Sequence, residues 1–196
     1  MIYVAVQGVG NFDAIKRMLD KLCIESTSSL SGVSDNVIKG VILPGNGSFD
    51  QYVKSLRENP TFLQSVMKLV DHGTPLLGIC VGMQVLFHSS AEGVEPGLGI
   101  LDGTIEKLSE KYQIPNLGWH DVIHQSTDSS RTFLSGGRFY FSHSFAKFLS
   151  NDDNFEEVLM CESYGRFCAG FRKDNIFGAQ FHPEKSSVAG FEYLNN

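Results

Sequence analysis

The sequence lacks any segment that would carry the chain into or across a membrane. No apolar run approaches the ~20 residues that a membrane-spanning helix needs. Met1 leads directly into the apolar residues 2–6 without a preceding basic stretch, so we expect no secretory signal. These features predict a cytoplasmic protein that makes no membrane contact.

Cysteine and positive charge are also scarce. The four cysteines form no Cys-x-x-Cys pair or other metal-binding spacing, so we expect free thiols and neither a metal nor another cofactor. Acidic residues outnumber Lys and Arg by 22 to 16, which gives a formal net charge of -6. This balance argues against a nucleic-acid partner, because phosphate backbones bind clusters of Lys and Arg.

The length of 196 residues suits one domain, residues 1–196, and the spacing of apolar residues indicates its class. Short apolar runs at residues 2–6, 40–43 and 75–79 are typical of buried strands, and a helical pattern follows each of them. Strands that alternate with helices build a parallel sheet with helices on both faces. After the third strand we expect a helix over residues 82–90.

The second half of the chain differs, because its expected strands follow one another with few helical patterns between them. The candidate strands are residues 105–108, 121–124, 138–142, 157–162, 167–172 and 176–181. Closely spaced strands favour antiparallel pairing. We therefore predict an α/β fold whose mostly parallel central sheet carries an antiparallel extension, with residues 125–137 as a surface loop.

Residues 78–82, Gly-Ile-Cys-Val-Gly, are the strongest local signal. A strand precedes them and a helical pattern follows, which is the layout of a nucleophile elbow with sulfur in place of the serine oxygen. The sharp turn would present the side chain of Cys80, and the helix behind it favours a thiolate. The amide of Val81 would then bind an oxyanion. The alternative is a buried cysteine in a glycine-rich turn.

Residues 180–186, Gln-Phe-His-Pro-Glu-Lys-Ser, supply an imidazole and a carboxylate. His182 and Glu184 lie two apart, so their side chains share one face of an extended backbone, and Pro183 favours that state at His182. A carboxylate beside an imidazole orients the ring and stabilises its charged form. With Cys80 at the same edge of the sheet these residues would make a catalytic triad. The alternative is a solvated His-Pro-Glu turn.

Residues 44–49, Pro-Gly-Asn-Gly-Ser-Phe, follow the second strand. Loops at the carboxyl ends of parallel strands surround the ligand crevice, and glycines let backbone amides approach a substrate closely. We expect a second oxyanion donor near Asn46, with Gly45 and Gly47 at the substrate. A tight strand-to-helix turn with Ser48 as N-cap is the plainer interpretation, and both can hold together.

The other histidines carry weaker signals. We expect His72, His88 and His124 to be surface residues or satisfied core residues. His143 stands in Phe-Ser-His-Ser-Phe, where an aromatic strand meets small polar residues, so it is a candidate to line the crevice.

With the loop, the elbow and the His-Pro-Glu segment in this order, the chain resembles the class I glutamine amidotransferases over essentially its whole length. Within that class it is most similar to the glutaminase subunits of imidazole glycerol phosphate synthase, an enzyme of histidine biosynthesis. The segments that carry this closer resemblance are residues 8–11, 44–49, 118–119 and 141–145.

The resemblance implies a glutaminase that releases ammonia from L-glutamine. It implies Cys80 as nucleophile, His182 as base and Glu184 as the group that orients the base. It further implies that L-glutamine is held by two side chains and a stretch of backbone, namely Gln84, Glu92 and the backbone near His143 and Ser144. The implied partner is a cyclase subunit of (βα)₈-barrel type, bound as a heterodimer.

Two segments depart from the family pattern. Residues 6–8 are Val-Gln-Gly where the family usually has Asp-Tyr-Gly. Residues 117–120 are Leu-Gly-Trp-His where it usually has Met-Gly-Trp-Asn, in the segment that lies toward the synthase. A related group of subunits serves sugar amidotransferases of surface polysaccharide synthesis, which gives a second candidate partner. Alternatives of other classes are a non-catalytic docking or regulatory subunit and a stand-alone hydrolase.

Overall fold

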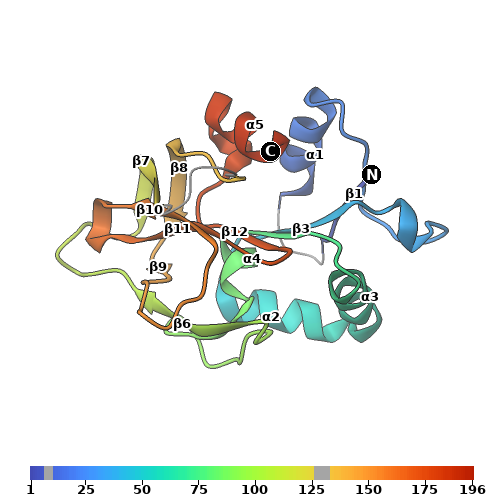
Figure 1. The fold of residues 1–196 in the computed structure, drawn as a ribbon. Helices are drawn as coiled ribbons and strands as arrows, with labels where there is room; N and C mark the ends of the chain where they lie inside the picture. The colour runs from blue at the N-terminus through green and yellow to red at the C-terminus, as the bar shows by residue number, and fades with distance from the viewer. Residues whose placement is uncertain (7–10, 126–132) are drawn as a thin grey trace.

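A nine-stranded mixed sheet forms the centre of the molecule (Figure 1). The computed structural model describes residues 1–6, 11–125 and 133–196, so the family-like residues 8–10 and most of the expected loop at 125–137 lie outside the described residues. The strands of this sheet are β1 (Ile2–Val4), β2 (Ser26–Thr27), β3 (Gly40–Pro44), β4 (Leu76–Ile79), β7 (Asn116–Gln125), β8 (Gly137–His143), β10 (Glu157–Cys161), β11 (Phe167–Lys173) and β12 (Ile176–Ala179).

The strand order, β2-β1-β3-β4-β12-β11-β10-β7-β8, divides the sheet into two halves. Neighbours from β2 to β12 pair in parallel, and neighbours from β12 to β8 pair antiparallel. Every residue of β3 is buried, as expected for a parallel strand covered on both faces, whereas β7 exposes many of its side chains. The predicted parallel core with an antiparallel extension is confirmed.

Helices cover both faces of the parallel half (Figure 1). On one face lie α1 (Phe12–Lys21) and α5 (Ser187–Asn195), and on the other lie α2 (Phe49–Glu58) and α3 (Pro60–Asp71). Asn59 caps α3, since its side chain accepts a hydrogen bond from the amide of Phe62 at 3.1 Å. The described residues also form the short 3₁₀ turns η1 (Asp35–Val37), η2 (Ser163–Gly165) and η3 (Pro183–Lys185).

The prediction of a helix over residues 82–90 was wrong for most of that range. Helix α4 spans only Val81–Gln84, and the chain then forms β5 (Phe87–Ser90). This strand pairs in parallel with β6 (Leu101–Lys107), which also pairs with β9 (Phe145–Ala146) in a separate three-stranded sheet. Pairing with a distant segment decides the conformation here, and local periodicity does not reveal such a partner.

The C-terminal helix α5 was not anticipated. Only Gly190 and Tyr193 of its nine residues are buried, so no regular apolar stripe marks it in the sequence. Among the described residues, none of the helices combines the length and the apolar character that a bilayer span requires.

Candidate functional site

The turn from β4 to α4 presents Cys80 on a strained backbone. Cys80 has φ +53° and ψ -117°, a conformation that side-chain-bearing residues rarely adopt. A Cβ at Gly78 would lie 2.6 Å from the carbonyl oxygen of Gly82, and one at Gly82 would overlap the carbonyl oxygen of Leu43. Glycine at position 78 therefore lets the chain turn this sharply, and glycine at position 82 lets the turn pack against β3. The expected strand-turn-helix layout is present.

The second candidate segment lies beside Cys80 because β12 is the parallel neighbour of β4. The amide of Cys80 donates to the carbonyl of Ala179 at 2.7 Å, and the amide of His182 donates to the carbonyl of Tyr140 at 2.9 Å. The second bond holds His182, just beyond β12, beside the middle of β8. The sulfur of Cys80 lies 3.9 Å from the carbonyl oxygen of Ser142, at the end of β8.

Glu184 completes the group. Its Oε1 lies 2.9 Å from Nδ1 of His182, and the two side chains are 3% and 5% exposed. His182 has extended backbone as predicted, but the shared strand face was the wrong explanation, because Pro183 begins the turn η3 and that turn brings Glu184 back to the ring. The hydroxyl of Ser186 donates to the carbonyl of His182 at 2.6 Å and fixes this turn.

The charges of these groups depend on one another. Burial by itself lowers the pKa of His182, but the thiolate of Cys80 and the carboxylate of Glu184 outweigh burial and raise that pKa to about 10. Among the influences that raise this pKa, the charge of Cys80 is the largest. The arrangement therefore suits an imidazolium at His182, with a proton ready for a leaving group.

The remaining cysteines lack such a setting. Burial raises the pKa of the Cys168 thiol to about 12 and also raises the pKa of the Cys161 thiol. Cys23 is exposed at the end of α1. A thiolate is the reactive form of cysteine, so Cys80 is the cysteine whose surroundings favour nucleophilic chemistry.

The loop at residues 44–49 packs directly on the elbow. A Cβ at Gly45 would overlap the amide nitrogen of Gly82, so only glycine permits this contact. The amide of Gly47 donates to the side chain of Asn46 at 3.1 Å, which occupies that amide in this conformation. Val81 is the first residue of α4, and its amide has no acceptor within the helix. The loop and the first turn of α4 therefore lie in direct backbone contact beside Cys80.

Gln84 and Glu92 are placed differently from each other. Nε2 of Gln84 donates to the carbonyl of Phe145 at 2.8 Å and to Oε1 of Gln180 at 2.9 Å, so both of its protons are used. Only its amide oxygen is left to a ligand, which suits an ammonium group. Glu92 lies beyond β5, and its Oε2 accepts from the amide of Phe49 at the start of α2, 2.9 Å away.

The side chain of His143 is buried and bound on both ring nitrogens. It is 7% exposed, its Nδ1 contacts the carbonyl of Phe145 at 2.9 Å, and its Nε2 contacts Nδ2 of Asn116 at 3.1 Å. Burial lowers the pKa of His143 to about 4, so the ring is neutral near pH 7. Ser144 follows it in the bend between β8 and β9.

The other histidines behave as the sequence suggests. His72 and His88 are exposed, and Nδ1 of His72 contacts the carbonyl of Lys68 at 2.6 Å. His124 is half-buried, with its Nε2 3.3 Å from Oε2 of Glu157. Within the described ranges, no cluster of three or more His, Cys, Asp or Glu side chains is arranged to hold a metal ion.

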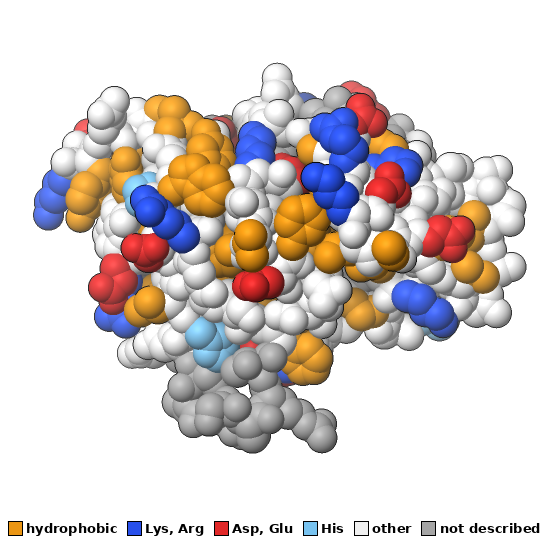
Figure 2. Space-filling model, turned by 90° about the horizontal axis from the view of Figure 1, so that it is seen from above, with side chains coloured by type: hydrophobic (Ala, Val, Ile, Leu, Met, Phe, Trp, Pro, Cys, Tyr) orange, Lys and Arg blue, Asp and Glu red, His pale blue; other side chains and the backbone are white. Residues whose placement is uncertain are grey.

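Two cavities flank α1. One of about 180 Å³ lies behind the triad, where Glu184 lines it together with Arg17, Lys21 and Ser187. Another of about 330 Å³ opens between α1 and α5, over the sheet, and none of its lining residues is a candidate site residue. Figure 2 looks onto this face and shows apolar side chains in separate groups, interspersed with charged ones.

Sequence comparison places the chain in one family. A family model described as glutamine amidotransferase class-I matches residues 15–196. The chain is 37% identical over 200 residues to the imidazole glycerol phosphate synthase subunit HisH 2 of Methanococcus maripaludis, covering 100% of this chain and 98% of that protein. It is 35% identical over 205 residues to the subunit HisH of the same synthase from Geobacillus sp., covering 100% and 95%.

Solved structures share the architecture. A crystal structure of a glutamine amidotransferase matches with a TM-score of 0.71 at 20% identity, covering 99% of this chain and 96% of the other. The structure of PurLQS from Thermotoga maritima matches with a TM-score of 0.72 at 22% identity, covering 99% and 95%. At these identities the likeness concerns the fold alone. The family match and the full-length relatives show that this chain is an enzyme of the class I glutamine amidotransferase family.

Proposed function

We propose that this chain, as one glutaminase domain, hydrolyses L-glutamine through Cys80, His182 and Glu184 and supplies ammonia to imidazole glycerol phosphate synthase in histidine biosynthesis. The observation that carries the chemistry is the buried His182 imidazole, which lies 2.9 Å from the Glu184 carboxylate and whose pKa is raised most by the charge of Cys80. The pathway is supported by full-length relatives of 35–37% identity that bear that synthase's name.

In the proposed reaction the Cys80 thiolate attacks the carbonyl carbon of the glutamine side chain. The amide of Val81 and an amide of the loop near Asn46 stabilise the oxyanion, and one such donor is typically worth ~10²–10³ in rate. Imidazolium His182 gives its proton to the departing ammonia, which leaves a thioester on the sulfur. Water activated by His182 then releases glutamate and restores the thiolate.

Substrate is held in this scheme by the amide oxygen of Gln84 on the α-ammonium group. Gly45, Gly47 and the backbone of His143 and Ser144 form the walls of the substrate site, and Glu92 fixes the loop by binding the start of α2. Ammonia leaves toward a cyclase subunit in a heterodimer.

Glutamate release from glutamine, with and without the cyclase subunit, tests the chemistry. Cys80→Ala is expected to abolish release, whereas Cys161→Ala, which removes a buried thiol from β10, is the matched control and keeps it. Undiminished release by Cys80→Ala would rule out the mechanism.

A sugar amidotransferase is the second candidate partner, and His120 is the residue that favours it. His120 stands where the synthase family usually has Asn, and its ring packs between Phe141 and Tyr164 with centroid distances of 5.8 and 5.5 Å. Titrating the chain with each partner subunit and following glutaminase stimulation separates the two. Stimulation by the sugar amidotransferase alone would reject histidine biosynthesis.

A further inference from the structure

Gln180 belongs to the His-Pro-Glu segment, yet the triad leaves it without a role. Its side chain is completely buried. Strands β4 and β12 run parallel and in register, so Cys80 and Gln180, each one residue beyond its strand, stand side by side. Nε2 of Gln180 donates a hydrogen bond to the sulfur of Cys80 at 3.8 Å.

The orientation of this amide follows from its neighbours. The carbonyl oxygen of Phe145 can only accept a hydrogen bond, so Gln84 must present its nitrogen there, at 2.8 Å. The same nitrogen lies 2.9 Å from the Gln180 side chain, which must therefore turn its oxygen toward Gln84. The nitrogen of Gln180 then faces the sulfur. A buried chain of three groups thus fixes an N–H donor at the nucleophile.

We propose that Gln180 is a positioning residue for Cys80, holding the sulfur in place and stabilising its negative charge through this N–H. The inference rests on the proposed role of Cys80 as nucleophile. A hydrogen bond to an ionised acceptor is stronger than one to a neutral acceptor, so this bond favours the thiolate over the thiol. His182 is coupled to the same sulfur, because the charge of Cys80 raises the pKa of its ring, and Gln180 adds a direct hydrogen bond.

The test compares wild type with Gln180→Met, which keeps the size but removes the donor, and Gln180→Glu, which places a carboxylate beside the sulfur. Alkylation of Cys80 by iodoacetamide is followed by mass spectrometry across pH in the substrate-free chain. At pH 7 we expect alkylation about tenfold slower in Gln180→Met, with its profile moved to higher pH, and slower still in Gln180→Glu. The kcat for glutamine should fall about tenfold and KM should change less than about threefold.

Gln84→Met provides an independent variant, because it removes the bond that orients Gln180 without touching the sulfur. It should slow alkylation in the same direction by a smaller factor, and it keeps the inference testable if Gln180→Met fails to fold. A wild-type alkylation profile and kcat in folded Gln180→Met, or a wild-type profile in Gln84→Met, would overturn the inference. If the Gln180 inference fails in this way while Cys80→Ala is inactive, the proposed glutaminase mechanism still stands. If Cys80→Ala is active, both the mechanism and the inference are rejected.

Discussion

At the residue scale, the elbow depends on glycines whose replacement has no room. A Cβ at Gly82 would overlap the carbonyl oxygen of Leu43. That oxygen belongs to the main chain and the added Cβ is bonded directly to it, so relieving the overlap requires a backbone shift. Gly82→Ala is expected to lower the free energy of unfolding by about 2–4 kcal/mol, the range of strained core substitutions, and to cut kcat by displacing Cys80. Urea unfolding and glutamate release measure the two effects.

Gly73→Ala is a useful comparison, since a Cβ there meets nothing within 4 Å although φ is +86°. Its cost should come from backbone strain alone, about 1 kcal/mol, without loss of kcat. An equal loss of kcat in both variants would contradict the steric explanation for the elbow.

The buried ring of His143 makes stability depend on pH. Its pKa is about 4 in the folded chain and 6.5 when exposed, so the unfolded chain binds the proton first as the pH falls. The neutral ring makes its full contribution to the free energy of unfolding above about pH 6.5. That contribution, about 3 kcal/mol, is lost as the pH falls to about 4. Urea unfolding at several pH values should show this fall in wild type and a shallower one in His143→Gln. Parallel curves for the two proteins would contradict the prediction.

At the scale of elements, two neighbouring helices begin in different ways. Asn59 caps α3 with its side chain, whereas Ser48 precedes α2 without a side-chain hydrogen bond. Asn59→Ala is therefore expected to lower the free energy of unfolding by about 1 kcal/mol, and Ser48→Ala by much less. Thermal and urea unfolding of both variants check the difference, and equal losses would show that the observed cap contributes little.

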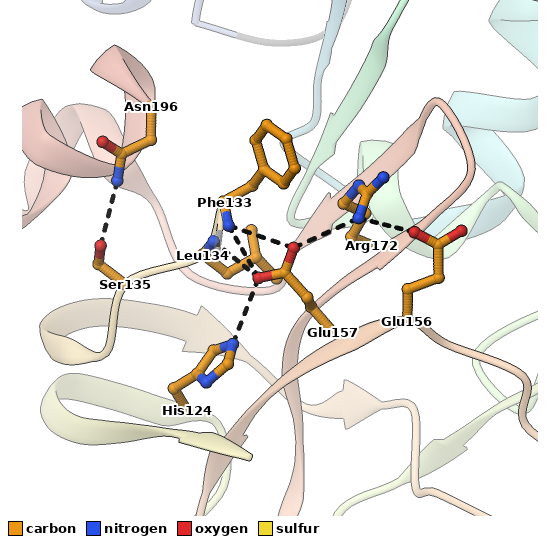
Figure 3. Close-up of polar contacts among 8 residues, drawn as sticks. All are labelled: His124, Phe133, Leu134, Ser135, Glu156, Glu157, Arg172 and Asn196. Carbon is orange, nitrogen blue, oxygen red and sulfur yellow. Dashed lines mark hydrogen bonds and ion pairs between the residues drawn. The ribbon is translucent and has the colours of Figure 1, made fainter. Parts of the chain in front are cut away.

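At the scale of the whole molecule, Glu157 joins segments that are far apart in sequence (Figure 3). Its carboxylate accepts from the amides of Phe133 and Leu134 at 2.9 and 3.1 Å and lies 3.3 Å from His124 and 3.5 Å from Arg172. The antiparallel extension is tied through this one buried acid to the segment at residues 133–134. Removing the negative charge of Glu157 would weaken its hydrogen bonds to several of these donors at once.

Glu157→Gln is expected to lower the free energy of unfolding by about 2–3 kcal/mol. Glu156→Gln is the matched control, because Glu156 pairs with the same Arg172 at 2.7 Å but its side chain is 42% exposed. An exposed pair contributes about 0–1 kcal/mol, so the control should change little. Equal losses would show that burial of Glu157 is not what makes it important.

The sequence alone determined the architecture and the identity of the reactive groups. Apolar runs such as residues 40–43 form strands that are buried on both faces, and the turn at Cys80 needs Gly78 because a Cβ there would meet the nearby backbone of Gly82. These features depend on a few neighbouring residues, so their spacing is visible in the chain. The Asn59 cap is local in the same sense, because its side chain binds an amide only three residues further along the chain.

Only the tertiary structure decided which distant groups meet. Residues 87–90 became a strand because β6 pairs with them, and Glu184 reaches His182 through a turn rather than along a strand. The donor that Gln180 offers to Cys80 arises from the register of β4 against β12. Strand pairing and register are set by packing of the whole sheet, and no local pattern of residues encodes them.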